Sequence, residues 1–100
     1  MNHSLIEEGR NSTLSVGGEL DALSSHELRP TLELLAHDPG RNVTIDLTNL
    51  KLIDSSGLGA LISLYKQTRA TGGTVSFIGV VDQPLVVFKL LRLDRAFGLN

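Results

Sequence analysis

The segment Ile53–Ala60 places short polar residues between a strand pattern and a helix pattern. Before it, Val43, Ile45 and Leu47 alternate with polar residues, as in a strand with one buried face. Within and after it, apolar residues recur at positions 58, 61, 62 and 65, which is the spacing of one helix face. A buried strand that leads into an amphipathic helix is typical of an α/β fold. This feature constrains the architecture more than any other in the chain.

Strand and helix patterns alternate through the rest of the sequence. We expect strands over residues 4–8, 12–17, 43–47 and 74–78, and helices over about 24–37, 57–71 and from 82 onward. The apolar residues at 50, 52 and 53 lead into the polar segment and are not counted as a separate strand. The predicted order is ββαβαβα, with helices packed against a mixed β-sheet of about four to five strands.

Two interruptions bear on the predicted boundaries. The segment Gly17–Asp21 breaks the alternation of the second strand, so we expect that strand to stop near Gly17. Pro30 lies inside the first helical pattern, and a proline costs roughly 3 kcal/mol in a regular helix interior. We therefore expect a cap at Ser24 or Ser25, with a kink or a late start of this helix.

Composition narrows the classes of function. One hundred residues are enough for one core and too few for two, so residues 1–100 are expected to form a single domain. The net charge of −2 and the scattered Lys and Arg residues provide no basic stripe for nucleic acid or an anionic membrane. Cysteine is absent, and no apolar run approaches the roughly 20 residues of a membrane span. We expect a cytoplasmic protein that binds other proteins and needs no cofactor or metal.

The polar segment can accept a phosphate. We expect Ser55 to be the helix N-cap, which leaves Ser56 at the first helical position with the freer hydroxyl. A phosphate on Ser56 would add about −1.5 to −2 charges near the positive end of the helix dipole. Gly57 and Gly59 each cost up to roughly 1 kcal/mol in a helix, so we expect their bare backbone to serve the close approach of a partner or loop. Spacing alone leaves open the simpler interpretation, in which Asp54 and the two serines only cap a helix.

Four segments occur together over nearly the whole chain: Gly18-Glu19-Leu20-Asp21, Asp54-Ser55-Ser56-Gly57-Leu58-Gly59, Tyr65-Lys66-Gln67 and Gly72-Gly73. In this combination the sequence resembles the STAS-domain family of bacterial anti-sigma factor antagonists. The resemblance implies phosphorylation of the second serine of the motif, Ser56. It also implies a partner-binding surface that comprises Asp21, Asp54, Ser55, Ser56, Gly57, Leu58 and Gly59. For Asp21 and Asp54, a role in capping a turn or helix is an equally good interpretation.

The resemblance further implies a partner-switching protein without catalytic residues. The unphosphorylated form would bind an anti-sigma factor that is also a serine/threonine kinase, and would thereby free a sigma factor. Phosphorylation of Ser56 would reverse this binding, and a serine phosphatase would restore it. Such a protein would be a monomer or a weak homodimer. The alternative is a STAS scaffold or sensor module in a stress-signalling complex or a lipid-transport assembly.

An enzyme would have to use Ser56 as a nucleophile with Asp54 and one histidine, His3, His26 or His37. The sequence has no Gly-x-Ser-x-Gly elbow, and the histidines do not show the spacing of metal ligands. We therefore do not expect an enzyme.

The C-terminal end departs from the family pattern, in which another strand and helix often follow. We expect Leu93 and Phe97 either to cover the core edge that a longer tail would occupy or to leave an apolar patch that promotes dimerisation.

Overall fold

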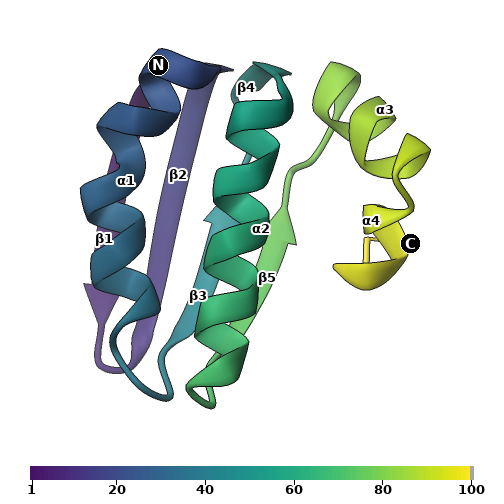
Figure 1. The fold of residues 1–100 in the computed structure, drawn as a ribbon. Helices are drawn as coiled ribbons and strands as arrows, with labels where there is room; N and C mark the ends of the chain where they lie inside the picture. Colours follow the sequence, from purple (N-terminus) through teal and green to yellow (C-terminus); the bar gives the residue numbers. More distant parts are fainter. Residues whose placement is uncertain (100) are drawn as a thin grey trace.

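The computed structural model describes residues 1–99. Figure 1 shows two long helices, α1 and α2, lying side by side over the sheet, with two short helices beside β5. The elements are β1 (Asn2–Glu8), β2 (Asn11–Leu20), α1 (Ala22–Ala36), β3 (Asn42–Asp46), β4 (Leu50–Ile53), α2 (Ser55–Ala70), β5 (Thr74–Ile78), α3 (Asp82–Leu90) and α4 (Leu93–Ala96). The α/β class and the mixed sheet are confirmed. The order is ββαββαβαα, because residues 50–53 form a strand and the C-terminal helical segment is divided.

The sheet is organised around β2, which is longer than predicted. Strands β1 and β2 form an antiparallel hairpin, and β2 pairs in parallel first with β3 and then, toward its end, with β4. Strand β5 pairs in parallel with β3. The prediction that the second strand stops near Gly17 was wrong. Gly17 stays paired with Asn2 of β1, and β2 continues to Leu20 beside β4. Gly18 pairs with Leu50 and Glu19 with Leu52, so the extra residue of the irregular register, Lys51, lies in β4.

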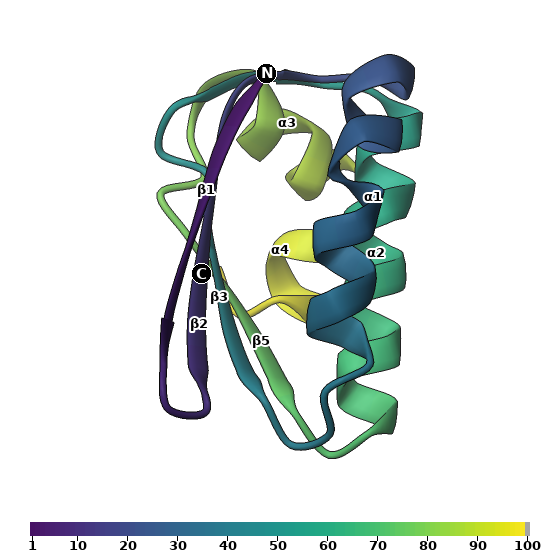
Figure 2. The same cartoon turned by 90° about the vertical axis from the view of Figure 1, so that its left-hand side faces the viewer.

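The core lies between the sheet and the two long helices, as the side view shows (Figure 2). The strands contribute every second residue to this core, and the helices contribute the apolar residues of one face, as the sequence pattern predicts. The fully buried leucines, isoleucine and valines of the strands are Leu14, Val16, Leu20, Val43, Ile45 and Leu50, and those of the helices are Leu28, Leu35, Leu61 and Leu64. This burial fixes which faces of α1 and α2 remain available at the surface.

Helix α1 starts earlier than predicted and tolerates Pro30. Its N-cap is Asp21, which forms a capping box with Ser24, so the expected cap at Ser24 or Ser25 was wrong. Pro30 lies on the exposed side of the helix, where water can bond the carbonyl group that loses its N–H partner. Leu28 and Leu32 are buried on the opposite side, and this packing holds the helix together across the proline.

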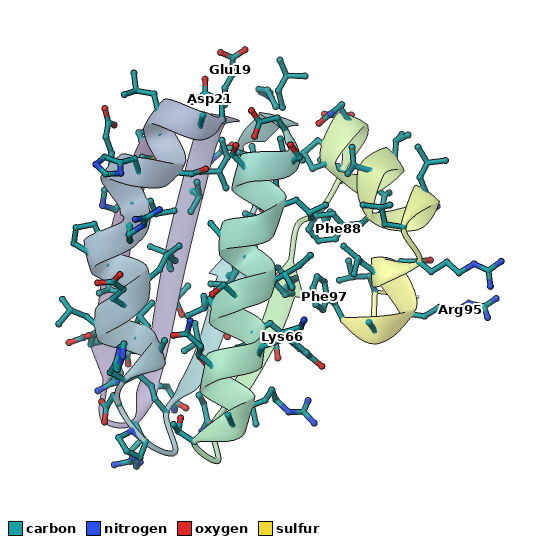
Figure 3. All side chains as sticks on the ribbon, in the orientation of Figure 1. Glu19, Asp21, Lys66, Phe88, Arg95 and Phe97 are labelled. Atoms are coloured by element: carbon teal, nitrogen blue, oxygen red, sulfur yellow. The ribbon has the colours of Figure 1, made fainter. Side chains whose placement is uncertain are left out.

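The C-terminal helices close one end of the core. Phe88 on α3 is fully buried, and Phe97 after α4 stacks on Phe77 of β5 with ring centroids 4.4 Å apart (Figure 3). Leu93 packs against the same core. Of the two expectations for this end, the structure shows the first, in which Leu93 and Phe97 cover the core edge. No helix within residues 1–99 is long and apolar enough to cross a membrane.

Candidate functional site

The predicted site lies where two parallel strands end side by side. Leu20 at the end of β2 is paired with Ile53 at the end of β4, and the Asp54 N–H donates to the Leu20 carbonyl oxygen at 3.2 Å. Asp21 and Asp54 therefore follow on neighbouring strands, and each begins a helix. Figure 3 shows Glu19 and Asp21 at this edge of the sheet, where α1 and α2 start. The fold thus places the N-termini of α1 and α2 next to each other.

Both helices are capped by carboxylates. The Ser24 N–H donates to Asp21 Oδ1 at 3.0 Å, and the Asp21 N–H donates to Ser24 Oγ at 2.9 Å. In α2, the Gly57 N–H donates to Asp54 Oδ1 at 3.0 Å. The predicted cap at Ser55 was therefore wrong, and Asp54 has that role because it directly follows the last residue of β4.

Ser55 and Ser56 are the first two residues of α2, and both are exposed. Because Asp54 is the cap, capping does not occupy the Ser55 hydroxyl. It therefore gives no reason to prefer Ser56 over Ser55 as the phosphate acceptor. Their positions do separate them, because Ser56 lines a groove between α2 and α1 whereas Ser55 does not. The structure leaves the Ser56 hydroxyl beside a second helix.

The two glycines of the motif have different surroundings. A Cβ atom on Gly57 would overlap the Leu20 carbonyl oxygen and lie 2.8 Å from Leu20 Cγ, so the first turn of α2 packs directly on the end of β2. Leu58 is only 6% exposed and belongs to the core. A Cβ atom on Gly59 would meet nothing within 4 Å. Gly57 and Leu58 therefore hold the turn in place, and Gly59 alone leaves open space at the surface.

Gln83 of α3 is a site residue that the sequence analysis missed. Its side-chain amide bonds both backbone groups of Ile53: the Ile53 N–H donates to Oε1 at 2.9 Å, and Nε2 donates to the Ile53 carbonyl oxygen at 3.0 Å. These bonds satisfy the side of β4 that does not pair with β2, just before Asp54. Glu19, Asp21, Asp54 and Gln83 line a small cleft here. Periodicity carries no signal for such a contact between distant segments.

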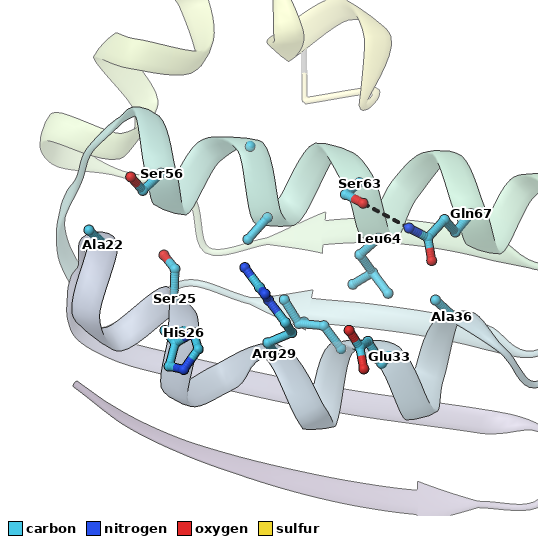
Figure 4. A pocket seen from close by; sticks show the side chains of 13 residues that line it. Ala22, Ser25, His26, Arg29, Glu33, Ala36, Ser56, Ser63, Leu64 and Gln67 are labelled. Atoms are coloured by element: carbon cyan, nitrogen blue, oxygen red, sulfur yellow. Dashed lines mark hydrogen bonds between the residues drawn. The ribbon is translucent and has the colours of Figure 1, made fainter.

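A larger groove of about 540 Å³ runs between α1 and α2 (Figure 4). Its polar lining residues are Ser25, His26, Arg29 and Glu33 from α1 and Ser56, Ser63 and Gln67 from α2. At one end, Gln67 Nε2 donates to Ser63 Oγ at 2.9 Å. At the end near Ser56, the Ser25 hydroxyl is buried and has no hydrogen-bond partner within residues 1–99. Ser25 was predicted only as a possible helix cap and Arg29 was not predicted as a site residue, although their spacing of four residues places them on one helix face.

The histidines of the rejected enzyme hypothesis are dispersed. His26 lines the groove with Ser56, whereas His3 lines a hollow beside β1 and His37 follows α1. No hydrogen bond joins His26 to Ser56 in the part of the chain that the structure describes. Within the same residues, no group of three His, Asp or Glu side chains is placed to hold a metal ion.

Acidification should destabilise the protein through the cap at Asp21. Hydrogen bonds from the backbone N–H and then the hydroxyl of Ser24 hold the pKa of the Asp21 carboxyl below its ordinary value of 3.8. Because the folded pKa is the lower one, this stabilisation is complete above the unfolded pKa and is lost as the pH falls through the folded pKa. Asp21→Asn removes the titrating group, so its stability should fall less on acidification. Urea denaturation between about pH 5 and about pH 2 measures the difference.

Asp46 provides the internal reference for this comparison. Its pKa is also lowered, by hydrogen bonds from the Thr48 hydroxyl and backbone N–H, and it titrates equally in both proteins. The same pH dependence in Asp21→Asn and the parent would show that the Asp21 cap does not contribute.

Comparisons with known proteins converge on one family. The family model described as "Mlab, STAS domain" matches residues 3–99. The anti-sigma-B factor antagonist of Listeria monocytogenes is 31% identical over 85 residues, which are 85% of this chain and 69% of the relative. The crystal structure of an anti-sigma factor antagonist from Mycobacterium paratuberculosis superposes with a TM-score of 0.78 at 25% identity, over 96% of this chain and 81% of the other. The anti-sigma factor antagonist SpoIIAA in its unphosphorylated form shares the fold, with a TM-score of 0.77 at 18% identity and 97% coverage of both chains.

Proposed function

This chain belongs to the STAS-domain family of anti-sigma factor antagonists, and on that premise we propose that it is a partner-switching protein controlled by a phosphate on Ser56. The unphosphorylated form binds an anti-sigma factor that is also a serine/threonine kinase, and so releases a sigma factor. Phosphorylation ends this binding, and a serine phosphatase restores it. The protein acts in the cytoplasm as a regulatory binding protein rather than an enzyme, and it is a monomer or a weak homodimer.

The observation that carries the proposal is the position of Ser56. Its hydroxyl is exposed on the first turn of α2, beside α1 and close to two carboxylate caps. A phosphate at this point adds about −1.5 to −2 charges where the helix dipole tolerates them. Next to Asp21 and Asp54, the phosphate turns a mildly acidic surface into a strongly acidic one, and it adds bulk where a partner would pack.

The proposed binding surface follows from which motif residues are exposed. Asp21, Asp54, Ser55, Ser56 and Gly59 can contact a partner directly. Gly57 and Leu58 take part by fixing the turn that presents the others, because both are buried. The partner surface is thus formed by the starts of α1 and α2 together.

The kinase reaction tests the site. The protein is incubated with the partner kinase and ATP, and peptides are analysed by mass spectrometry. Phosphate is expected on Ser56 in the parent and in Ser55→Ala, and it should be absent from Ser56→Ala. Because Ser55 is the neighbouring exposed serine, Ser55→Ala is the matched control. Modification of Ser55 or of a residue outside α2 would overturn the assignment.

Ser56→Asp should bind the kinase at least about tenfold more weakly than the parent, which corresponds to about 1.4 kcal/mol. The reason is the added charge beside two carboxylates on a surface that the partner approaches closely. Ser56→Ala should bind like the parent, because Ser56 is exposed and the change removes only a surface hydroxyl without adding charge or bulk. Calorimetry measures all three affinities. Equal affinities for Ser56→Asp and the parent would contradict an electrostatic switch.

One observation favours a second candidate function. The family model that matches the chain is named for Mlab and not for an antagonist. The alternative is therefore a STAS module in a stress-signalling complex or a lipid-transport assembly, which would use the same surface to bind its neighbours. A pull-down from native lysate separates the two functions. Recovery of a kinase with a sigma-factor system supports the antagonist, and recovery of transporter subunits supports the alternative.

A further inference from the structure

We propose that the groove between α1 and α2 is the receiving site for the phosphate on Ser56, with the Arg29 guanidinium group as its counter-charge and the Ser25 hydroxyl as an additional donor. The inference rests on the proposed function in one respect, which is that Ser56 carries the phosphate. The inference adds that residues of α1 bind this phosphate and fix its position in the groove.

The topology brings Ser25 and Ser56 to the same end of the groove, and Arg29 lies one turn further along it. Helices α1 and α2 start at the same edge of the sheet and run in the same direction (Figure 1). Ser56 lies in the first turn of α2, Ser25 lies in the first turn of α1, and Arg29 lies one turn further along α1. Figure 4 shows the Arg29 side chain extending from α1 toward α2 and the Ser25 oxygen directed the same way. All three residues line one continuous hollow.

Residues 1–99 provide no ion pair for Arg29 and no hydrogen-bond partner for the Ser25 hydroxyl. Arg29 forms no ion pair within residues 1–99, even though Glu33 lies one turn further along and lines the same groove. Ser25 is 9% exposed, and its hydroxyl has no hydrogen-bond partner among the residues that the structure describes. A buried hydroxyl without a hydrogen bond costs roughly 1–3 kcal/mol, so an acceptor that reaches it would be stabilising. At the opposite end, Ser63 and Gln67 satisfy each other.

There is also room for the phosphate. Gly59 follows Ser56 by nearly one turn on the groove side of α2, and a Cβ atom there would meet nothing within 4 Å. Gly59 therefore places no side chain in this part of the groove, and the neighbouring lining residue of α2, Ala60, contributes only a methyl group. The long Arg29 side chain can move within this space to bond the phosphate.

Charge determines the direction that the phosphate takes. The caps Asp21 and Asp54 repel a phosphate from the side of the strands, whereas Arg29 attracts it along the groove. A guanidinium group can donate two parallel hydrogen bonds to phosphate oxygens, which is the geometry that makes such pairs strong. His26 and Glu33 are the other titratable groups that line the groove. The phosphate would thus lie over the groove and close it to a partner.

The test places phosphoserine at position 56 by genetic code expansion, so that no kinase is needed. The second pKa of the phosphate, about 6 when free, is measured by ³¹P NMR titration. The positive charge of Arg29 stabilises the dianionic form of the phosphate and lowers its second pKa. Arg29→Gln should therefore raise this pKa by about 0.5 units or more. His26→Gln is titrated in parallel to separate the histidine charge from that of Arg29. Arg95→Gln is the matched control, because Arg95 lies on α4, well away from the groove (Figure 3), and should change nothing.

Ser25→Ala provides a second measurement, because its expected effect on the melting temperature differs between the unphosphorylated and the phosphorylated protein. In the unphosphorylated protein it removes a buried hydroxyl without a partner, so the melting temperature should not fall. In the phosphorylated protein it removes a donor, so the melting temperature should fall. Equal ³¹P pKa values for Arg29→Gln and the parent, or a Ser25→Ala effect that does not depend on phosphorylation, would overturn the inference. If the kinase modifies another residue, the proposed function fails, while these measurements still decide whether the groove binds the phosphate.

Discussion

Gly57→Ala should destabilise the protein by about 2–4 kcal/mol, since it overpacks a core contact that has no room to relax. The new methyl group would overlap the Leu20 carbonyl oxygen, and it would lie 2.8 Å from Leu20 Cγ and 3.0 Å from Ile53 Cγ1. The carbonyl cannot move freely, because it accepts the hydrogen bond from the Asp54 N–H. Urea denaturation followed by circular dichroism measures the change in the free energy of unfolding.

Gly59→Ala is the control on the same helix, two residues further along. Its methyl group would meet nothing within 4 Å, so the higher helix propensity of alanine should stabilise the protein by up to about 1 kcal/mol. If the partner approaches Gly59 closely, this variant should bind more weakly although it is more stable. Equal destabilisation by Gly57→Ala and Gly59→Ala would contradict the distinction between a packing glycine and an exposed glycine.

Phe88→Ala should destabilise the protein by about 3–5 kcal/mol, a large part of the stability of a domain of this size. Phe88 is fully buried, and its ring packs edge-on against Phe77 and Phe97 with centroids 5.8 Å and 5.6 Å away. The change leaves a cavity between α3, α4 and β5. Leu90→Ala on the same helix is the control, because Leu90 is 76% exposed and its loss should change stability by no more than about 0.5 kcal/mol.

The effect of Phe88→Ala should extend to the candidate site. Helix α3 carries Gln83, which bonds both backbone groups of Ile53 immediately before the Asp54 cap. Loosening α3 should therefore increase hydrogen exchange at the Ile53 N–H, while Leu90→Ala should leave that exchange unchanged. Exchange at Ile53 that does not respond to Phe88→Ala would show that Gln83 holds β4 independently of the packing of α3.

The elements with strong periodicity were predicted well, and the errors lie at their ends. Strand β5 was predicted with its correct bounds. The predicted face of α2 was correct in part: Leu58 and Leu61 are buried, Ile62 and Tyr65 are half-buried, and the fully buried Leu64 was not in it. The start of α1 was placed too late because Pro30 was given more weight than the packing of the helix. The second strand was ended too early because Gly17 and Gly18 indicate a break, whereas both glycines stay in β2, Gly17 paired with Asn2 of β1 and Gly18 with Leu50 of β4.

The sequence by itself determined the α/β class, the strand–helix junction at residues 53–60 and two candidate acceptor hydroxyls, because these depend on local patterns of apolar and polar residues. Only the tertiary structure decided that Asp54 is the cap and that Gly57 packs inside while Gly59 faces open space. It also placed Ser56, and not Ser55, beside α1. Each of these depends on the parallel pairing of β2 with β4, which brings two helix starts together from positions more than thirty residues apart along the chain. Local periodicity carries no information about such a register.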